Sequence, residues 1–181
     1  MKRLILALLL LSACKEEAAT PPPVAMTDAS TGYFCQMDLL GHPGPKAQIH
    51  LATYPGAPLF FSQVRDAVAY LRMPEQIDTV TATYVSDMGA APSWTDPGAT
   101  NWVMAGTAVY VVGSDMKGGM DAPEVVPFAD PAKARAFAAL HGGKVLALQD
   151  IPDSALTSGA GGTDTDADYA ARLRILSRPG G

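Results

Sequence analysis

The first 31 residues limit how much of this chain can fold into a domain. Met1-Lys2-Arg3 is a short cationic start, and Leu4–Leu11 is an apolar run too short to cross a bilayer as a stable helix. This combination is typical of a secretory signal peptide, which we place at residues 1–13. The rest of the chain is therefore expected to fold after export.

The end of the signal peptide predicts a lipid anchor. The run Leu11-Ser12-Ala13-Cys14 resembles a bacterial lipobox, in which cleavage leaves a diacylated cysteine as the new N-terminus. This predicts lipidation at Cys14 and a membrane-anchored lipoprotein of the periplasm. Lys15 at the next position favours the outer membrane. The alternative is an ordinary signal peptide cleaved elsewhere, with Cys14 as an incidental residue.

Residues 14–31 are expected to form a flexible tether. They are rich in Ala, Pro, Thr and Glu, include Pro21-Pro22-Pro23, and offer little to bury. About 150 residues remain, which is enough for one compact domain or two small ones. The net charge is −5 with no basic stripe, so nucleic acid is not an expected partner.

Hydrophobic periodicity predicts short strands alternating with two helices. The expected strands or extended segments are Tyr33–Leu39, Lys46–Tyr54, Val80–Val85, Trp102–Met104, Ala108–Gly113, Val125–Phe128 and Lys144–Leu148. One helix is expected from an N-cap at Ser62 to about Arg72, and the other from Asp130-Pro131 to about His141, where Gly142-Gly143 ends it.

The order of these elements predicts an α+β fold of two small units. Each unit has a ββαβ topology in which one helix covers an antiparallel sheet. The first unit spans residues 32–89 and the second spans residues 99–151, with a Pro- and Gly-rich loop between them. Residues 152–181 change to Gly, Ser, Thr and Asp and are expected to form a flexible tail.

Cysteine usage indicates that one thiol is unusual. The chain has two cysteines, and lipidation would use Cys14, which leaves Cys35 alone in an oxidising compartment. A disulfide framework is then excluded. The Cys35 thiol is either buried and inert, or kept for metal or redox chemistry.

Cys35 and Met37 form a Cys-x-Met pair that favours copper. On a strand, two residues separated by one lie on the same face, so their sulfur atoms would lie side by side. Soft thiolate and thioether donors select Cu(I), whereas zinc requires four ligands that this chain does not supply. The alternative is that both side chains simply pack in the core.

The segments around this pair resemble a known family. Phe34-Cys35-Gln36-Met37-Asp38-Leu39 with the following His42–Ile49, and Gly118-Gly119-Met120-Asp121-Ala122-Pro123-Glu124, are similar to signature segments of the NosL family. Ala99–Trp102 and Tyr110–Asp115 add to the resemblance. These proteins are lipoprotein copper chaperones that serve nitrous oxide reductase.

The resemblance implies one Cu(I) per chain, bound by Cys35, Met37 and a third ligand. Met120 is the first candidate for the third ligand because it supplies another soft sulfur. A nitrogen ligand is the alternative, with His42 before His50. His50 on a strand and His141 at a helix end are otherwise expected to be structural.

The implied function is delivery of copper without turnover, so we do not expect an enzyme. The implied partners are an ABC-transporter-linked periplasmic assembly protein and nitrous oxide reductase, whose copper-sulfide centre would receive the metal. Two alternatives remain open. One is a thiol-dependent enzyme, either organomercurial-lyase-like or redox, and the other is a scaffold lipoprotein with a buried Cys35.

Overall fold

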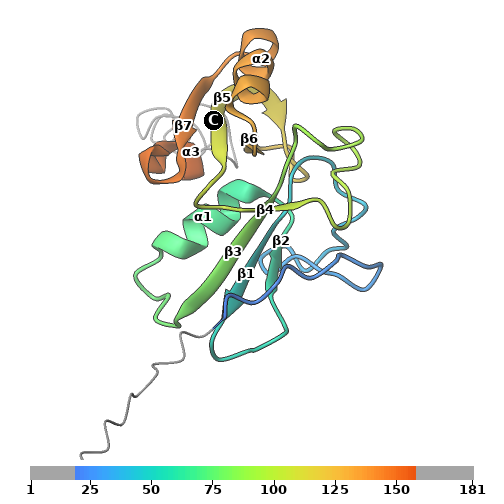
Figure 1. Ribbon diagram of the computed structural model, residues 1–181, viewed down its shortest axis with the longest axis vertical. Helices are drawn as coiled ribbons and strands as arrows, with labels where there is room; N and C mark the ends of the chain where they lie inside the picture. Colours follow the sequence, from blue (N-terminus) through green and yellow to red (C-terminus); the bar gives the residue numbers. More distant parts are fainter. Residues whose placement is uncertain (1–18, 158–181) are drawn as a thin grey trace, which may run out of the picture.

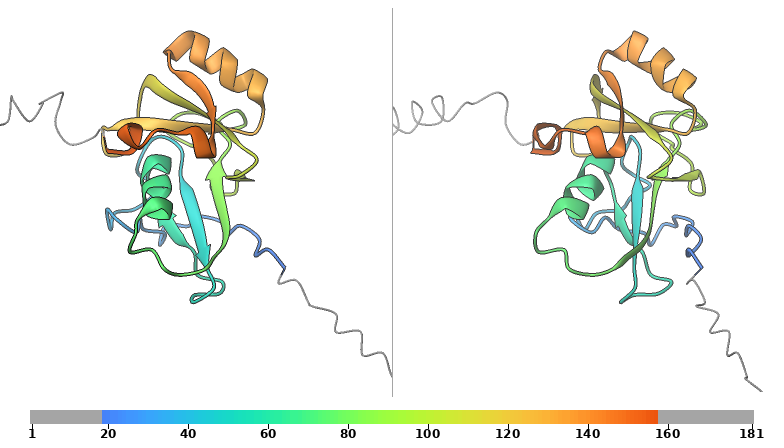
Figure 2. Two further views of the ribbon diagram at one scale, coloured as in Figure 1. Left: turned by 90° about the vertical axis from the view of Figure 1, so that its left-hand side faces the viewer. Right: turned by 60° about the vertical axis from the view of Figure 1, so that its left-hand side comes forward.

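The computed structural model describes residues 19–157, which form two antiparallel sheets and the helices packed on them (Figure 1). This confirms the predicted α+β class. Views from two further sides show the first sheet with α1 at one end of the molecule and the second sheet with α2 at the other (Figure 2). Within residues 19–157, no helix has both the length and the apolar character needed to cross a membrane. The predicted signal peptide and Cys14 lie outside the described residues.

The first sheet contains four antiparallel strands in the order β2-β1-β3-β4. They are β1 (Ala47–Leu51), β2 (Leu59–Phe61), β3 (Val80–Ser86) and β4 (Trp102–Met104). Helix α1 (Val64–Arg72) connects β2 to β3. The exposed turn of residues 52–58 joins β1 to β2, so the first unit has the predicted ββαβ order, although with different first strands.

The second sheet contains three antiparallel strands in the order β6-β5-β7. They are β5 (Val109–Lys117), β6 (Pro123–Phe128) and β7 (Lys144–Ala147), followed by a 3-10 turn η1 (Leu148–Asp150) and a short helix α3 (Asp153–Thr157). Helix α2 (Pro131–His141) joins β6 to β7. This is the predicted ββαβ order of the second unit.

Helix α2 begins and ends where its sequence predicts. The Asp130 carboxylate accepts the backbone N–H of Ala132 at 2.7 Å, and Pro131 occupies the first turn, where its missing N–H costs nothing. Gly142, with φ of +74°, ends the helix in a conformation that side chains with a Cβ rarely adopt.

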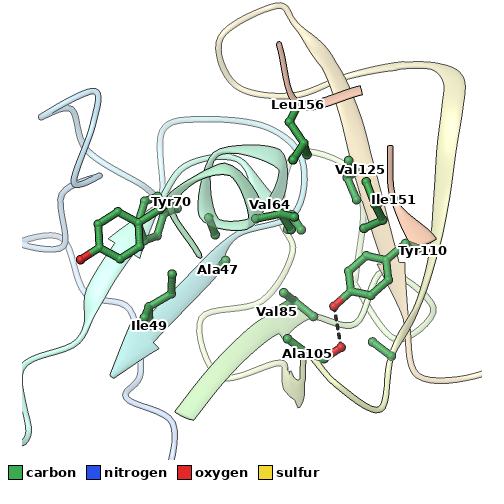
Figure 3. Packing of buried hydrophobic residues seen from close by; sticks show 14 of the residues in the cluster. Ala47, Ile49, Val64, Tyr70, Val85, Ala105, Tyr110, Val125, Ile151 and Leu156 are labelled. Atoms are coloured by element: carbon green, nitrogen blue, oxygen red, sulfur yellow. Dashed lines mark hydrogen bonds between the residues drawn. The ribbon is translucent and has the colours of Figure 1, made fainter. Parts of the chain in front are cut away.

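The main hydrophobic core lies between the two sheets. It joins Ala47 and Ile49 of β1 and Val64 of α1 to Tyr110 and Val125 of the second sheet (Figure 3). Tyr110 is fully buried, and its hydroxyl donates to the Ala105 carbonyl at 2.7 Å. The opposite face of the second sheet packs on α2 through a smaller cluster that contains Val111, Val126, Phe128 and Ala134.

The predicted boundary between the units is wrong at β4. Trp102–Met104 was assigned to the second unit, residues 99–151, but it pairs with β3 of the first sheet, with Val85 opposite Val103. The loop before it therefore does not separate two modules. The free edge of β3 offers unpaired backbone N–H and C=O groups, and residues 102–104 pair with them.

The predicted strand Tyr33–Leu39 is also wrong. These residues form a tight turned loop, and the only ladder contact recorded for the segment is an isolated bridge between Thr31 and Asp38. The hairpin partner of β1 is β2 instead. The alternation of apolar and polar residues in this segment therefore does not mark the two faces of a sheet. Cys35 and Met37 do not lie on one face of a strand.

Residues 19–31, expected to belong to the tether, form a strap against the first sheet. The Gln48 side chain pairs with both the N–H and the carbonyl of Val24, at 2.8 and 2.9 Å, and the Tyr84 hydroxyl donates to the Pro21 carbonyl at 2.6 Å. Met26 is buried, and its N–H bonds to the Ala99 carbonyl. This strap explains why Gln48 and His50, on the second face of β1, are also buried.

The expected flexible tail, residues 152–181, begins with an ordered helix. Leu156 of α3 is buried against α1, and the Arg65 guanidinium bonds to the Leu156 carbonyl. Residues 158–181 of the predicted tail lie outside the described part of the chain.

Candidate metal site

Cys35 and Met37 lie in one compact loop, residues 31–38, which we call the Cys35 loop. The Gly32 N–H donates to the Met37 carbonyl at 3.0 Å, and the Gln36 N–H donates to the Gly32 carbonyl at 2.8 Å. Gln36 takes a positive φ of +56°, and its side chain returns to the Tyr33 carbonyl at 2.7 Å. The two sulfur residues therefore lie in one turn rather than on a strand.

The Cys35 thiol is free and half-buried. Its Sγ lies 3.4 Å from the Ser62 hydroxyl, to which it donates at the end of β2. A Cβ built on Gly32 would lie 2.5 Å from this sulfur, so only glycine leaves room for it there. The thiol is therefore partly accessible from solvent.

Met37 and Met120 are both exposed, at 38% and 47% of their surface. Met120 lies in a turn closed by a hydrogen bond from the Gly118 N–H to the Ala122 carbonyl at 2.9 Å. Residues 118–122, here called the Met120 loop, follow β5 of the second sheet. Thioethers at the surface can be reached by a ligand from solvent or by a second protein.

The Met120 loop packs against the turn that contains His42. A Cβ on Gly119 would lie 2.7 Å from the His42 Cβ, and a Cβ on Gly118 would lie 2.4 Å from the Gln63 amide nitrogen. Gln63 is next in sequence to Ser62, which contacts Cys35. The structure thus brings the Cys35 loop, His42 and the Met120 loop to the same junction between the sheets.

His42 has one ring nitrogen available. Its Nδ1 lies 2.6 Å from the Asp38 carbonyl oxygen, which can only accept, so Nδ1 carries the proton. Nε2 is then the unprotonated nitrogen in the neutral ring, and it is the atom that could coordinate a metal.

Two other histidines have structural partners. His50 Nε2 bonds to the Gln48 side-chain oxygen at 2.9 Å behind the strap, and burial lowers the pKa of His50. His141 Nδ1 lies 3.0 Å from the Asp115 carboxylate and its ring packs on Phe137. These contacts agree with the structural roles expected for both residues.

Lys46 is a buried cation beneath the site. Its Nζ donates to the carbonyls of His42, Pro43 and Gly44 at 2.8, 3.2 and 2.6 Å. Burial lowers the pKa of Lys46 to about 8, and attraction to the charges of Glu124 and Cys35 only partly offsets this. Lys46 therefore holds the His42 turn in place.

Glu124 and Gln63 are the other buried polar residues at this junction. One oxygen of Glu124 accepts the N–H groups of Arg65 and Val125 at 3.1 and 2.8 Å, so Glu124 on β6 caps the start of α1. The predicted N-cap Ser62 is wrong, because the cap residue is Gln63 and its side chain makes no capping bond. The second Glu124 oxygen and the Gln63 amide nitrogen have no hydrogen-bond partner.

The donor set favours a soft metal. Residues 19–157 contain no group of three or more His, Cys, Asp or Glu side chains that could hold a metal. What the junction offers is one thiol, two thioethers and one imidazole nitrogen. Such donors suit a monovalent soft ion with few ligands rather than zinc or a hard cation.

Comparison with known proteins decides the family. The model of the NosL family matches residues 23–156. The chain belongs to the NosL family. The predicted resemblance is confirmed, and the match covers both sheets and all the loops of the candidate site.

Named NosL relatives cover most of the chain. The copper-binding lipoprotein NosL of Achromobacter cycloclastes is 55% identical, covering 97% of this chain and 93% of the relative. The copper-binding lipoprotein NosL of Stutzerimonas stutzeri is 33% identical, covering 76% of this chain and 70% of the relative. The crystal structure of the copper chaperone NosL from Shewanella denitrificans superimposes with a TM-score of 0.68 at 29% identity, covering 74% of this chain and 99% of that one.

Proposed function

We propose that the protein is a periplasmic, lipid-anchored Cu(I) chaperone that supplies copper for the copper-sulfide centre of nitrous oxide reductase. Cys35 and Met37 bind the ion, and Met120 is the third ligand, with His42 Nε2 as the alternative. Diacylated Cys14 anchors the protein, with the outer membrane favoured. An ABC-transporter-linked periplasmic assembly protein is the proposed docking partner, and the protein performs no catalytic turnover.

One observation carries this proposal: the free thiol of Cys35 lies in a loop shared with Met37, at the junction that also holds His42 and the Met120 loop. Cu(I) prefers soft sulfur donors and is satisfied by two or three of them. The copper-binding names of the relatives support the same choice of metal.

The exposure of the thioethers supports release by ligand exchange. Because Met37 and Met120 are exposed, a sulfur of a partner can enter the coordination sphere as one of them leaves. Cys35, which is half-buried, is the ligand that keeps the ion until transfer.

The first test is titration of the apo protein with Cu(I) against bicinchoninate. Cys35→Ser is expected to remove competitive binding, and Met37→Leu to weaken it by about tenfold, equivalent to about 1.4 kcal/mol. Met104→Leu is the matched control, because Met104 is similarly exposed, at 39%, and lies on β4, outside the loops of the candidate site. Unchanged affinity in Cys35→Ser would falsify the assignment.

A second pair of variants identifies the third ligand. Met120→Leu should lower the affinity and remove one sulfur neighbour from the copper X-ray absorption spectrum, while His42→Gln should leave both unchanged. The reverse result would make His42 Nε2 the ligand. If neither variant changes the spectrum, the proposal of a third ligand from these two loops is wrong.

Thiol labelling separates the chaperone from the two alternatives. In apo protein the half-buried Cys35 should react with a maleimide, and stoichiometric Cu(I) should protect it. A scaffold with an inert thiol would not react. A redox enzyme would need a resolving thiol, and among residues 19–157 Cys35 is the only free cysteine.

Delivery and anchoring require their own measurements. Copper-loaded protein should transfer its ion to the purified assembly protein, and Cys35→Ser should not. Membrane fractions should retain the wild type and lose Cys14→Ser. Retention of Cys14→Ser in the outer-membrane fraction would contradict the lipid anchor.

A further inference from the structure

The strap leaves very little chain between the folded domain and Cys14. Residues 21–26 are held on the first sheet by Gln48 and Tyr84, and the described chain begins at Ala19. Only residues 15–18 separate Ala19 from Cys14. Even fully extended, this stretch can span about 18 Å at most. A lipid on Cys14 therefore keeps the domain close to the bilayer surface and restricts which end can face it.

The strap begins at one end of the first sheet. Ala19 and Pro21 line a groove of about 360 Å³ together with Pro55 and Gly56 of the exposed β1–β2 turn. The loop between α1 and β3 lies at the same end (Figure 1). The two loops are joined there, because the Thr53 hydroxyl donates to the Asp78 carboxylate at 2.7 Å and the Ala52 N–H bonds to the Thr79 carbonyl.

This end carries exposed apolar side chains. Ile77 is 90% exposed and Tyr54 is 56% exposed, on the two neighbouring loops. The turn of residues 52–58 (ATYPGAP) contains no Lys, Arg, Asp or Glu. An aromatic ring with a polar tip and an aliphatic side chain are the kind of residues that enter the headgroup region of a bilayer.

The candidate metal site lies at the opposite end of the same hairpin. Lys46 immediately precedes β1 and Ser62 immediately follows β2, whereas residues 52–58 join the other ends of these strands. Five residues of β1 separate the two ends by about 17 Å. A protein that rests on the turn would present Ser62 and the His42 turn away from the membrane, whereas Tyr33 and Phe34 of the Cys35 loop line a groove with Ile77 on the membrane side.

We propose that the β1–β2 turn and the α1–β3 loop, through Tyr54 and Ile77, rest on a zwitterionic phospholipid surface, so that the side of the metal site formed by the His42 turn and the Met120 loop points into the periplasm. This orientation rests on the proposed anchor at Cys14. Glu75 and Asp78 lie in the α1–β3 loop, and their carboxylates disfavour an anionic lipid surface. The lipid on Cys14 keeps the domain close to the bilayer, and Tyr54 and Ile77 determine which end of the domain faces it.

The test uses lipidated protein on phosphatidylcholine vesicles that contain a headgroup nitroxide lipid. In a Cys35→Ser background, a fluorophore is attached at Ile77→Cys or, as the matched control, at Leu140→Cys. Leu140 is 81% exposed on α2, at the other end of the molecule (Figure 1). Residues that enter the headgroup region lie within about 10 Å of it, so the Ile77 probe should lose about half its fluorescence and the Leu140 probe should not change.

Equal quenching at both positions, or none at either in protein that sediments with the vesicles, would overturn the orientation. Failure to sediment would instead show that the lipid anchor of the proposed function is absent, and would overturn the orientation with it. Copper affinity is measured separately and is unaffected by either result.

A second labelling position tests the apolar contact itself. With the fluorophore on Ala57→Cys, in the exposed turn, the double substitution Tyr54→Ser and Ile77→Ser should reduce quenching while the protein still sediments. Undiminished quenching at Ala57 in the double variant would overturn the role of these two side chains.

Discussion

At the residue scale, buried polar side chains hold the His42 turn and the start of α1 beside the candidate site. Lys46 binds three carbonyls of the His42 turn, and Glu124 caps α1 from the second sheet. A buried group that satisfies backbone atoms of another segment fixes that segment, because breaking the contact leaves an unpaired polar atom. These bonds therefore restrict the backbone next to the exposed sulfur atoms.

Gly118 is expected to tolerate no side chain. A Cβ there would lie 2.3 Å from a Glu124 oxygen and 2.4 Å from the Gln63 amide nitrogen. Gly118→Ala should lower the free energy of unfolding by about 1–3 kcal/mol through overpacking and displace the Met120 loop. The control is Gly106→Ala, where a Cβ meets nothing within 4 Å. Denaturant unfolding of both variants provides the measurement, and equal stability would contradict the close packing.

Glu124 should make the stability depend on pH. Burial raises the pKa of Glu124 from its ordinary value of 4.5 to about 8, so the folded protein keeps a proton that the unfolded chain releases. Stability contributed by this group is therefore lost as the pH rises from about 4.5 to about 8, at up to about 1.4 kcal/mol per pH unit. Glu124→Gln cannot titrate and should lack this loss.

The measurement is the difference in unfolding free energy between Glu124→Gln and wild type at about pH 5.5 and about pH 7.5. The difference should move in favour of the variant at the higher pH. Groups that titrate in both proteins cancel in this comparison. A difference that stays constant would mean that Glu124 is ionised in the folded protein throughout.

Sequence reasoning found some site residues and missed others for physical reasons. Cys35 was found because an exported protein rarely keeps a lone thiol. The strand geometry proposed for it failed because Gln36 adopts a positive φ, for which a glutamine gives no sequence signal. Lys46 and Glu124 were missed because charged residues are ordinarily exposed, and only tertiary packing shows that these two are not.

At the scale of elements, side-chain bonds to backbone carbonyls attach the C-terminal segment to the domain. The Arg72 guanidinium at the end of α1 donates to the carbonyls of Leu148 and Ile151, at 3.2 and 2.7 Å, and to the Asp153 carboxylate at 2.6 Å. These bonds fasten η1 and α3 alongside α1. Together with the Arg65 bond to Leu156 and the burial of Ile151 and Leu156, they hold residues 148–157 in place.

Arg72→Ala should release this segment. Loss of the charged hydrogen bonds is expected to cost about 1.5–3 kcal/mol and to speed amide exchange in residues 148–157. Arg135→Ala is the control, because Arg135 is exposed on α2. Hydrogen exchange that is unchanged in α3 of Arg72→Ala would show that the Arg65 bond and the burial of Ile151 and Leu156 are enough to hold the segment.

Elements were predicted well where local chemistry defines their ends. Helix α2 has an Asp-Pro start and a glycine end, and the structure confirms both predicted ends. The start of α1 was predicted wrongly because its capping carboxylate, Glu124, comes from a strand 59 residues later. Likewise, the sequence predicts a tether where the strap lies, because the partners of Val24 and Pro21 are side chains on distant strands. Contacts between residues far apart in the sequence cannot be predicted from a short stretch of sequence.

At the scale of the whole molecule, the two sheets share one core. Tyr110 and Val125 of the second sheet pack in the same cluster as Ile49 and Val64 of the first unit. The candidate site lies across the same junction. Separating the units would expose this cluster and remove the Glu124 cap from α1, so we expect them to fold together rather than as independent modules.

The two tryptophans allow this cooperativity to be measured. Trp102 lies on β4 of the first sheet near Phe60, and Trp94 stacks on Phe137 of α2, with ring centroids 6.4 Å apart in both pairs. In Trp94→Phe the fluorescence reports the first sheet, and in Trp102→Phe it reports the second sheet. If the shared core makes unfolding two-state, each variant should show the same denaturation midpoint by fluorescence as by circular dichroism. A fluorescence transition that precedes the circular dichroism transition in either variant would show that one unit unfolds while the other persists, and the metal site would then be lost before the protein as a whole.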